Sequence, residues 1–371
     1  TPLTCRRQRQ MCIRDRPEIT ATYRDAWHAV DETSTVMLAI WWAQRDPVSA
    51  FNEGHTYIRT SQNLWSATVV RIWARSAPDE ALQAIAASQM PSMATEWSRS
   101  LRLALVRGWF DGEADPMPLL DYIRTLPVGR PVKETLDAFL ERLVDARGIE
   151  QAVEIVEGID AGDARGFRRD VFQRFATVLT TTDPQAAIDW ASRHVETPAG
   201  ELLYQRIARR WSRSDGPATL EWVMSWPDDP TRSRALLANY RIFLSRDGEG
   251  AIAWLDARPE DDTALRLLYR ASVSYLARRG QPLEAIARAE AVEDAKRREN
   301  LLGTALGEWL ATDQAAAERW IAERGPSEEV LREARKQQRG RRQSLTAAAR
   351  ANAGRSADTN MDSSTEVQAI D

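Results

Sequence analysis

The chain has few of the residues that build disulfide, metal or membrane-spanning frameworks. Its 371 residues include only two cysteines, Cys5 and Cys12, and three histidines, His28, His55 and His194. Two cysteines exclude a disulfide framework, and the three separated histidines form no cluster with metal-ligand spacing. Near the end of a predicted second helix, His194 is expected to be a surface residue or a residue favoured by the C-terminal helix dipole. No run of about 18 apolar residues occurs, so we expect no transmembrane helix, and we expect no cofactor.

Lysine is also scarce. Only Lys133, Lys296 and Lys336 occur, so 47 of the 50 basic residues are arginine. Codon bias in a GC-rich genome explains this preference without any functional role. The formal net charge of −4 argues against binding a polyanion by bulk charge. Hydrophobic residues make up 43% of the chain, which is enough for a folded core.

Motifs of common catalytic sites are missing. The sequence has no Gly-x-Ser-x-Gly elbow and no glycine-rich phosphate loop. The glycines of GTALGEW (303–309) lie in a helical pattern and indicate close helix packing. The pairs Asp228-Asp229 and Asp261-Asp262 stand at predicted turns and helix starts, where helix capping explains them. We therefore expect that the protein is not an enzyme.

An internal repeat of about 33 residues is the main feature of the chain. In TTTDPQAAIDW (180–190), Asp-Pro is followed by Ala three residues after the Pro and by Trp six residues after it. Altered copies occur nine times between residues 42 and 320, and their Pro-equivalent positions are 31 to 38 residues apart. Nine of the fourteen tryptophans stand either at an anchor before the Pro or six residues after it. Such periodicity is typical of repeat proteins.

Each copy predicts a helix–turn–helix unit. Leu203, Ile207 and Trp211 step by four residues, which indicates a first helix that ends at the anchor. Asp then caps a second helix, Pro takes its first position, and Ala allows close approach one turn later. Neighbouring units would stack into one core, with the tryptophans as large core residues. The anchors are Trp42, Trp73, Trp109, Val144, Leu179, Trp211, Leu244, Leu276 and Trp309.

The unit resembles tetratricopeptide-like repeats. In YLARRGQPLEAIARA (275–289), Leu276, Gly280 and Ala285 have the spacing of that family's first-helix Tyr, turn Gly and second-helix Ala. LVDARGIEQAVEIV (143–156) is similar, whereas Asp-Pro or Asp-Gly replaces the turn Gly in most copies. Bacterial proteins with degenerate Asp-Pro-x-x-Ala-x-x-Trp helical repeats look more similar still. The resemblance implies a superhelix whose first helices line the concave side; it implies no reaction.

We therefore predict an all-α fold, a right-handed α-solenoid of about nine helix–turn–helix repeats. The repeat domain is expected over 17–325, followed by a polar, arginine-rich capping helix over 326–352 and a disordered tail over 353–371. We interpret residues 1–16 as a non-native segment, because MCIRDR looks like a translated sequencing adapter. An N-terminal signal would then be missing, and the sequence indicates neither a cytoplasmic nor a periplasmic location.

Arginine gathers at two places near the anchors. Eight of the eighteen positions two before or two after an anchor are arginine, where the arginine content predicts about two. With Arg270, these residues are our candidate ligand-binding set: Arg71, Arg75, Arg107, Arg142, Arg209, Arg213, Arg246, Arg270 and Arg278. The resemblance places them in the concave groove, where they would suit carboxylates or phosphates. The helix dipole alone also favours cations there, and Asp111, Asp145 and Asp170 would weaken the field.

Three functions fit this sequence to different degrees. The first is a non-enzymatic scaffold whose concave face binds a protein or peptide, such as an acidic or C-terminal segment. The second is a helical accessory region of a bacterial cell-envelope enzyme or assembly whose catalytic part is absent from this chain. The third is nucleic-acid binding, against which the net charge of −4 argues. We expect the scaffold; its oligomeric state is not indicated.

Overall fold

All regular elements in the described part of the chain are helices, so the all-α prediction is confirmed. The structure is a computed structural model that describes residues 31–54, 62–88, 96–159, 166–194, 200–258, 265–344 and 346–347. Our interpretations of residues 1–16, of the tail over 353–371, and of Cys5, Cys12, His28 and His55 lie outside the described residues.

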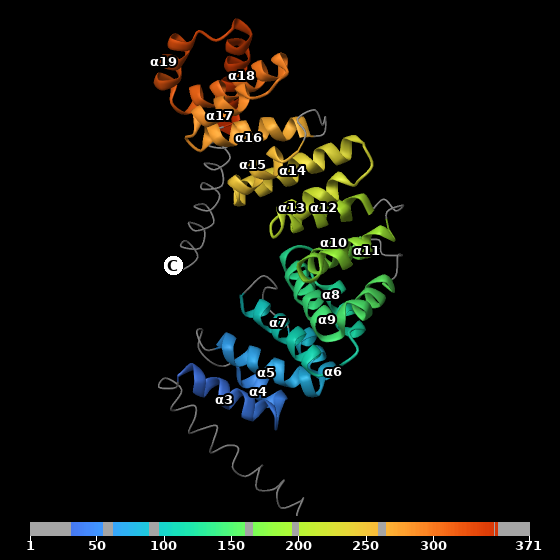
Figure 1. Cartoon of the computed structure of the whole chain (residues 1–371). Helices are drawn as coiled ribbons and strands as arrows, with labels where there is room; N and C mark the ends of the chain where they lie inside the picture. Colours follow the sequence, from blue (N-terminus) through green and yellow to red (C-terminus); the bar gives the residue numbers. More distant parts are fainter. Residues whose placement is uncertain are drawn as a thin grey trace, which may run out of the picture. The chain divides into compact units, whose positions relative to one another are not determined.

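The chain divides into two compact units, Thr1–Tyr204 and Gln205–Asp371, with the division inside α12 (Gly200–Trp211). Figure 1 labels the helices. The described helices of the N-terminal unit are α3 (Glu32–Ala43), α4 (Pro47–Gly54), α5 (Gln62–Ser76), α6 (Pro78–Ala87), α7 (Glu96–Asp111), α8 (Met117–Thr125), α9 (Arg130–Glu157), α10 (Phe167–Thr182) and α11 (Pro184–Ser192).

The C-terminal unit continues with the same alternation of longer first helices and shorter second helices. Its elements are α13 (Gly216–Met224), α14 (Pro230–Arg246), α15 (Gly248–Asp256), α16 (Arg266–Arg278), α17 (Pro282–Glu290), α18 (Ala295–Thr312) and α19 (Gln314–Arg324). A last helix, which we call the terminal helix, covers residues 328–344 inside the segment predicted as a cap. The predicted domain boundaries stay a prediction.

The turn between α10 and α11 shows how a hairpin forms from local chemistry. The N–H of Asp183 donates to the Leu179 carbonyl at 2.7 Å and closes α10. Its carboxylate accepts from the N–H groups of Gln185 and Ala186, and Pro184 opens α11. Six aspartates cap second helices in this way: Asp46, Asp115, Asp183, Asp215, Asp247 and Asp313.

The position four residues after each capping aspartate, or after the equivalent residue Ala77, Gly148 or Gln281, has no solvent exposure. It is 0% exposed at Ala50, Ala81, Leu119, Ala152, Ala187, Thr219, Ala251, Ala285 and Ala317. Of the nine tryptophans in the register, Trp73, Trp109, Trp190 and Trp254 are buried, and the other five are partly buried. Seven of these nine buried residues are alanine, as the pattern predicts, and four of the nine tryptophans are core residues.

One predicted anchor is wrong by a residue. In α14 the N–H of Asp247 donates to the carbonyl of Phe243 at 2.8 Å, as Asp183 does to Leu179. Phe243, and not Leu244, therefore has the anchor position. Both side chains are buried, so hydrophobicity alone does not separate them.

The degenerate fourth copy is divided by a glycine instead of an Asp-Pro turn. Within α9, Gly148 has φ 78° and ψ 169°, which interrupts the helix between Val144 and Ala152. A positive φ of this kind favours glycine because it has no Cβ. The two segments on either side are the expected first and second helices of this copy.

First helices pack side by side within each unit, and glycine allows the closest approach. A Cβ on Gly108 in α7 would lie 2.2 Å from the Arg71 carbonyl oxygen of α5. In α18 a Cβ on Gly303 or Gly307 would lie 2.6 Å from Glu333 or from the Ala334 carbonyl oxygen of the terminal helix. The prediction that GTALGEW marks close helix packing is confirmed.

Candidate functional site

The described residues contain no cluster suited to metal binding. No three His, Cys, Asp or Glu side chains in the described ranges are grouped so that they could hold a metal ion. None of the helices seen in this part of the chain has the length and apolar character to cross a membrane. Asp229 caps α14 through the N–H groups of Thr231 and Arg232, so the capping prediction for this residue is confirmed. Asp261 and Asp262 lie outside the described residues.

His194 lies just after α11, as expected from the sequence. Its Nε2 is 3.3 Å from the Glu157 carboxylate, and its ring packs against the rings of Phe172 and Trp190. The side chain is mostly covered, so its position is less exposed than a surface role implies.

The nine candidate arginines divide between the two units. Arg71 and Arg75 lie on α5, Arg107 on α7 and Arg142 on α9, all in the N-terminal unit. In the C-terminal unit, Arg209 and Arg213 lie at the end of α12, Arg246 ends α14, and Arg270 and Arg278 lie on α16. Four of them form ion pairs with described carboxylates: Arg71, Arg142, Arg270 and Arg278.

One carboxylate connects two of these arginines in the N-terminal unit. Asp111 at the end of α7 accepts from Arg71 of α5 and from Arg142 of α9, each at 2.8 Å. Three neighbouring first helices therefore present these side chains on one face, and Asp111 neutralises part of their charge, as expected. Arg75 and Arg107 have no hydrogen bond or ion pair with any described residue.

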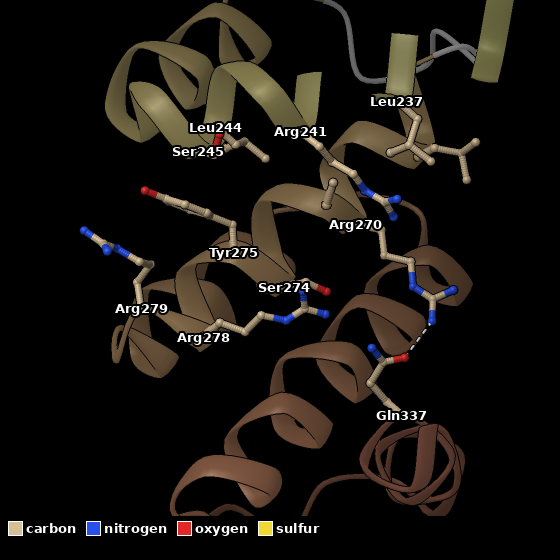
Figure 2. Close-up of a pocket in the computed structure, with 12 residues that line it drawn as sticks. Leu237, Arg241, Leu244, Ser245, Arg270, Ser274, Tyr275, Arg278, Arg279 and Gln337 are labelled. Atoms are coloured by element: carbon tan, nitrogen blue, oxygen red, sulfur yellow. Dashed lines mark hydrogen bonds between the residues drawn. The ribbon is translucent and has the colours of Figure 1, made fainter. Parts of the chain in front are cut away.

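Four arginines line a groove of the C-terminal unit (Figure 2). The groove has a volume of about 690 Å³ and lies between α14, α16 and the terminal helix. No acidic residue is among the described residues that line it. The lining comprises Leu237, Arg241, Leu244, Ser245, Leu267, Arg270, Ala271, Ser274, Tyr275, Arg278, Arg279 and Gln337.

Two of the lining arginines form ion pairs with carboxylates that do not line the groove. Arg270 contacts Glu333 at 3.3 Å and the side-chain oxygen of Gln337 at 3.1 Å, both on the terminal helix. Arg278 donates to Glu308, whose side chain is fully buried, and this hydrogen bond raises the pKa of Arg278 above its ordinary value. Each guanidinium has five N–H groups, so donors remain for a ligand.

The sequence analysis missed Arg241 and Arg279, which also line the groove. Arg241 stands two residues before Phe243, so the corrected anchor would have selected it. Neither arginine side chain has a hydrogen bond or ion pair with a described residue. In contrast, Arg209 and Arg213 do not line this groove, and Arg246 lines a neighbouring hollow that also contains carboxylates such as Asp256.

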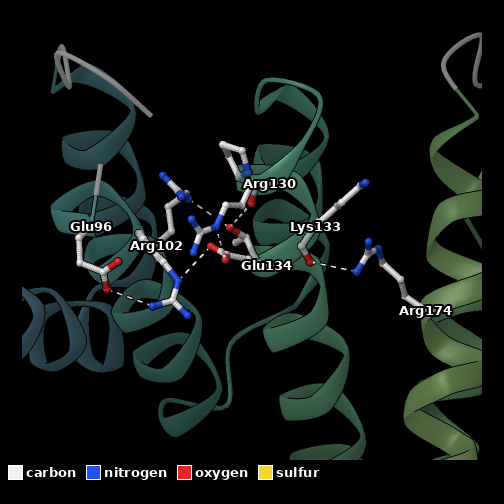
Figure 3. Close-up of polar contacts among 9 residues, drawn as sticks. Glu96, Arg102, Arg130, Lys133, Glu134 and Arg174 are labelled. Atoms are coloured by element: carbon white, nitrogen blue, oxygen red, sulfur yellow. Dashed lines mark hydrogen bonds and ion pairs between the residues drawn. The ribbon is translucent and has the colours of Figure 1, made fainter. Parts of the chain in front are cut away.

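A second polar cluster, in the N-terminal unit, consists of hydrogen bonds and ion pairs that connect neighbouring helices (Figure 3). Glu134 of α9 accepts from Arg130 at 2.7 Å and from Arg99 of α7 at 2.9 Å, and the Arg130 hydrogen bond lowers its pKa. Arg102 of α7 is buried and donates to Thr135 at 3.2 Å; burial lowers its pKa. These contacts join α7 to α9.

Neither a protein-family model nor a curated protein nor a solved structure matches this chain. The class that the described residues define is an all-α protein with an arginine-lined groove.

Proposed function

We propose that the protein is a non-enzymatic scaffold that binds acidic protein or peptide segments on the faces of its first helices. The arrangement that we propose is a right-handed α-solenoid of about nine tetratricopeptide-like repeats. The scaffold would need no cofactor, because binding a peptide segment involves no chemical reaction.

Two observations support the repeat arrangement. The cap, the fully buried position after it and the tryptophan positions recur in the same order in both units. Consecutive first helices also pack against each other within one unit, as in α3 with α5, α5 with α7, α14 with α16 and α16 with α18. Stacked hairpins bury faces that a single hairpin leaves exposed.

The groove of the C-terminal unit carries the functional proposal. Four arginines and no described acidic residue line it, while Leu237, Leu267 and Tyr275 add apolar surface. Guanidinium groups form short, charge-assisted and often paired hydrogen bonds with carboxylates. A surface of this composition therefore favours an acidic segment that also has apolar side chains.

The test is affinity capture with matched charge reversals. Residues 17–352 are immobilised as wild type, as Arg241→Glu and as Arg319→Glu, and the proteins captured from a native lysate are identified by mass spectrometry. Arg319 lies on α19, exposed and without a described partner, so it controls for the change in net charge. We expect a set of acidic partners that Arg241→Glu loses and Arg319→Glu retains. Equal capture by all three proteins contradicts the groove assignment.

A nucleic-acid ligand is tested in the same preparation. A gel shift with single-stranded RNA that weakens with salt and with Arg241→Glu would replace the peptide proposal. We expect no such shift.

A further inference from the structure

Three polar residues form a row along one face of α16. Arg270, Ser274 and Arg278 follow one another at intervals of four residues, and all three line the groove. Eight residues of α-helix span about 12 Å along the axis. Two fixed cationic positions are therefore separated by this distance, with a small hydroxyl between them.

The two ends of the row are oriented before any ligand arrives. Glu308 and Glu333 hold Arg278 and Arg270, yet the arginine side chains keep 44% and 48% of their exposure. In Figure 2, Arg241 of α14 extends its guanidinium toward the stem of the Arg270 side chain, which adds a second cation at this end. Side chains already held in place lose less conformational entropy on binding.

The middle of the groove has a different character. Ala271 and Tyr275 of α16, which follow Arg270 and Ser274 in the sequence, are partly exposed and add apolar surface beside the row, whereas Leu244 of α14 is buried. Ser274 has no hydrogen bond with any described residue, so its hydroxyl is free to pair with a ligand's backbone. A helical ligand satisfies its own backbone groups, whereas an extended one needs partners of this kind.

We propose, on the basis of the proposed function, that the groove binds an extended peptide segment of the pattern acidic-x-apolar-x-acidic. Alternate side chains of an extended chain point to the same side, and four residues span about 13 Å. The two carboxylates then reach Arg270 with Arg241 at one end and Arg278 at the other. The apolar side chain between them lies against Ala271 and Tyr275.

Fluorescence anisotropy with short synthetic peptides tests the spacing. The probe is a dye-labelled, end-blocked peptide containing Glu-Ser-Leu-Ser-Glu, and its control is the isomer Glu-Glu-Leu-Ser-Ser. We expect the spaced probe to bind the full chain about tenfold more tightly than the isomer, because the isomer reaches one end of the row only. High salt should weaken the binding of the spaced probe.

Variants locate the binding on the protein. Arg241→Glu should weaken the spaced probe about tenfold, whereas Arg319→Glu should leave it unchanged. Both arginines lack described partners, so neither change removes an ion pair from the fold. Circular dichroism confirms that each variant is folded.

The outcomes separate the two proposals. Equal binding of the two isomers, with Arg241→Glu still weakening both, overturns the extended spacing and leaves the acidic-segment scaffold in place. Tight binding only by a helix-forming peptide with glutamates eight residues apart also overturns the extended form. Binding of the spaced probe that Arg241→Glu and Arg319→Glu affect equally overturns the groove site itself.

Discussion

Arg278 of α16 donates to Glu308 of α18 in a salt bridge whose two members differ sharply in exposure. The arginine is 44% exposed, whereas the glutamate side chain has no exposure. Gln337 donates to the same carboxylate at 3.0 Å, and the Nε of Arg341 lies 3.6 Å from its second oxygen. A buried carboxylate therefore orients a groove arginine and joins α16, α18 and the terminal helix.

The first prediction concerns this buried pair. Arg278→Met should lower the free energy of unfolding by about 2–3 kcal/mol, because it leaves the Glu308 charge buried with weaker partners. Adding Glu308→Leu removes that charge, so the double variant should be more stable than Arg278→Met alone. Urea unfolding of the three proteins measures both effects. A double variant that is no more stable than Arg278→Met contradicts the role of the buried charge.

The second prediction compares two glycines that should respond in opposite directions to alanine. A Cβ on Gly307 would lie 2.6 Å from the Ala334 carbonyl oxygen, whereas nothing lies within 4 Å of a Cβ on Gly340. Gly307→Ala should destabilise the unit by about 1–3 kcal/mol by forcing α18 from the terminal helix. Gly340→Ala should stabilise it by about 0.5–1 kcal/mol, because alanine is the better helix former. Thermal unfolding gives both signs, and a stabilising Gly307→Ala would disprove the close packing.

The third prediction tests the caps that define the hairpins. Asp183→Ala should lower the free energy of unfolding by about 1 kcal/mol, because the N–H groups of Gln185 and Ala186 lose their acceptor. Asp183→Asn should have a smaller effect, since an amide oxygen still accepts. Asp145→Ala is the control, because Asp145 is exposed and has no described partner. Equal stability of the Asp183→Ala and Asp145→Ala proteins in urea would refute the capping role.

The fourth prediction is a pH dependence. The hydrogen bond from Arg130, followed by the charges of Arg130 and Arg99, lowers the folded-state pKa of Glu134 below its ordinary value near 4.5. A lowered pKa contributes stability above the ordinary value, and this contribution is lost as pH falls through the folded-state pKa. Glu134→Gln should therefore be less stable than wild type at pH 7, with the difference shrinking below about pH 4.5. Urea unfolding across this range measures it, and a difference that grows toward acid pH would reverse the assigned sign.

The sequence by itself determined the features that depend on near neighbours. A cap such as Asp183 and the buried Ala187 lie within five residues of the turn, so their chemistry is readable from spacing. The all-α class follows from the same local periodicity. The one anchor error, Leu244 for Phe243, arose because two adjacent apolar residues are both buried, and only the backbone hydrogen bond distinguishes them.

Only the tertiary structure decided which arginines act together. Asp111 forms ion pairs with Arg71 and Arg142. Arg241, Arg270, Arg278 and Arg279 line one groove together with Gln337. The physical reason is distance along the chain: Asp111 lies 40 residues from Arg71 and 31 from Arg142, and Gln337 lies 67 residues from Arg270. Their pairing depends on which helices become neighbours and how closely glycine lets them approach. The spacing of residues along the sequence does not predict which helices become neighbours.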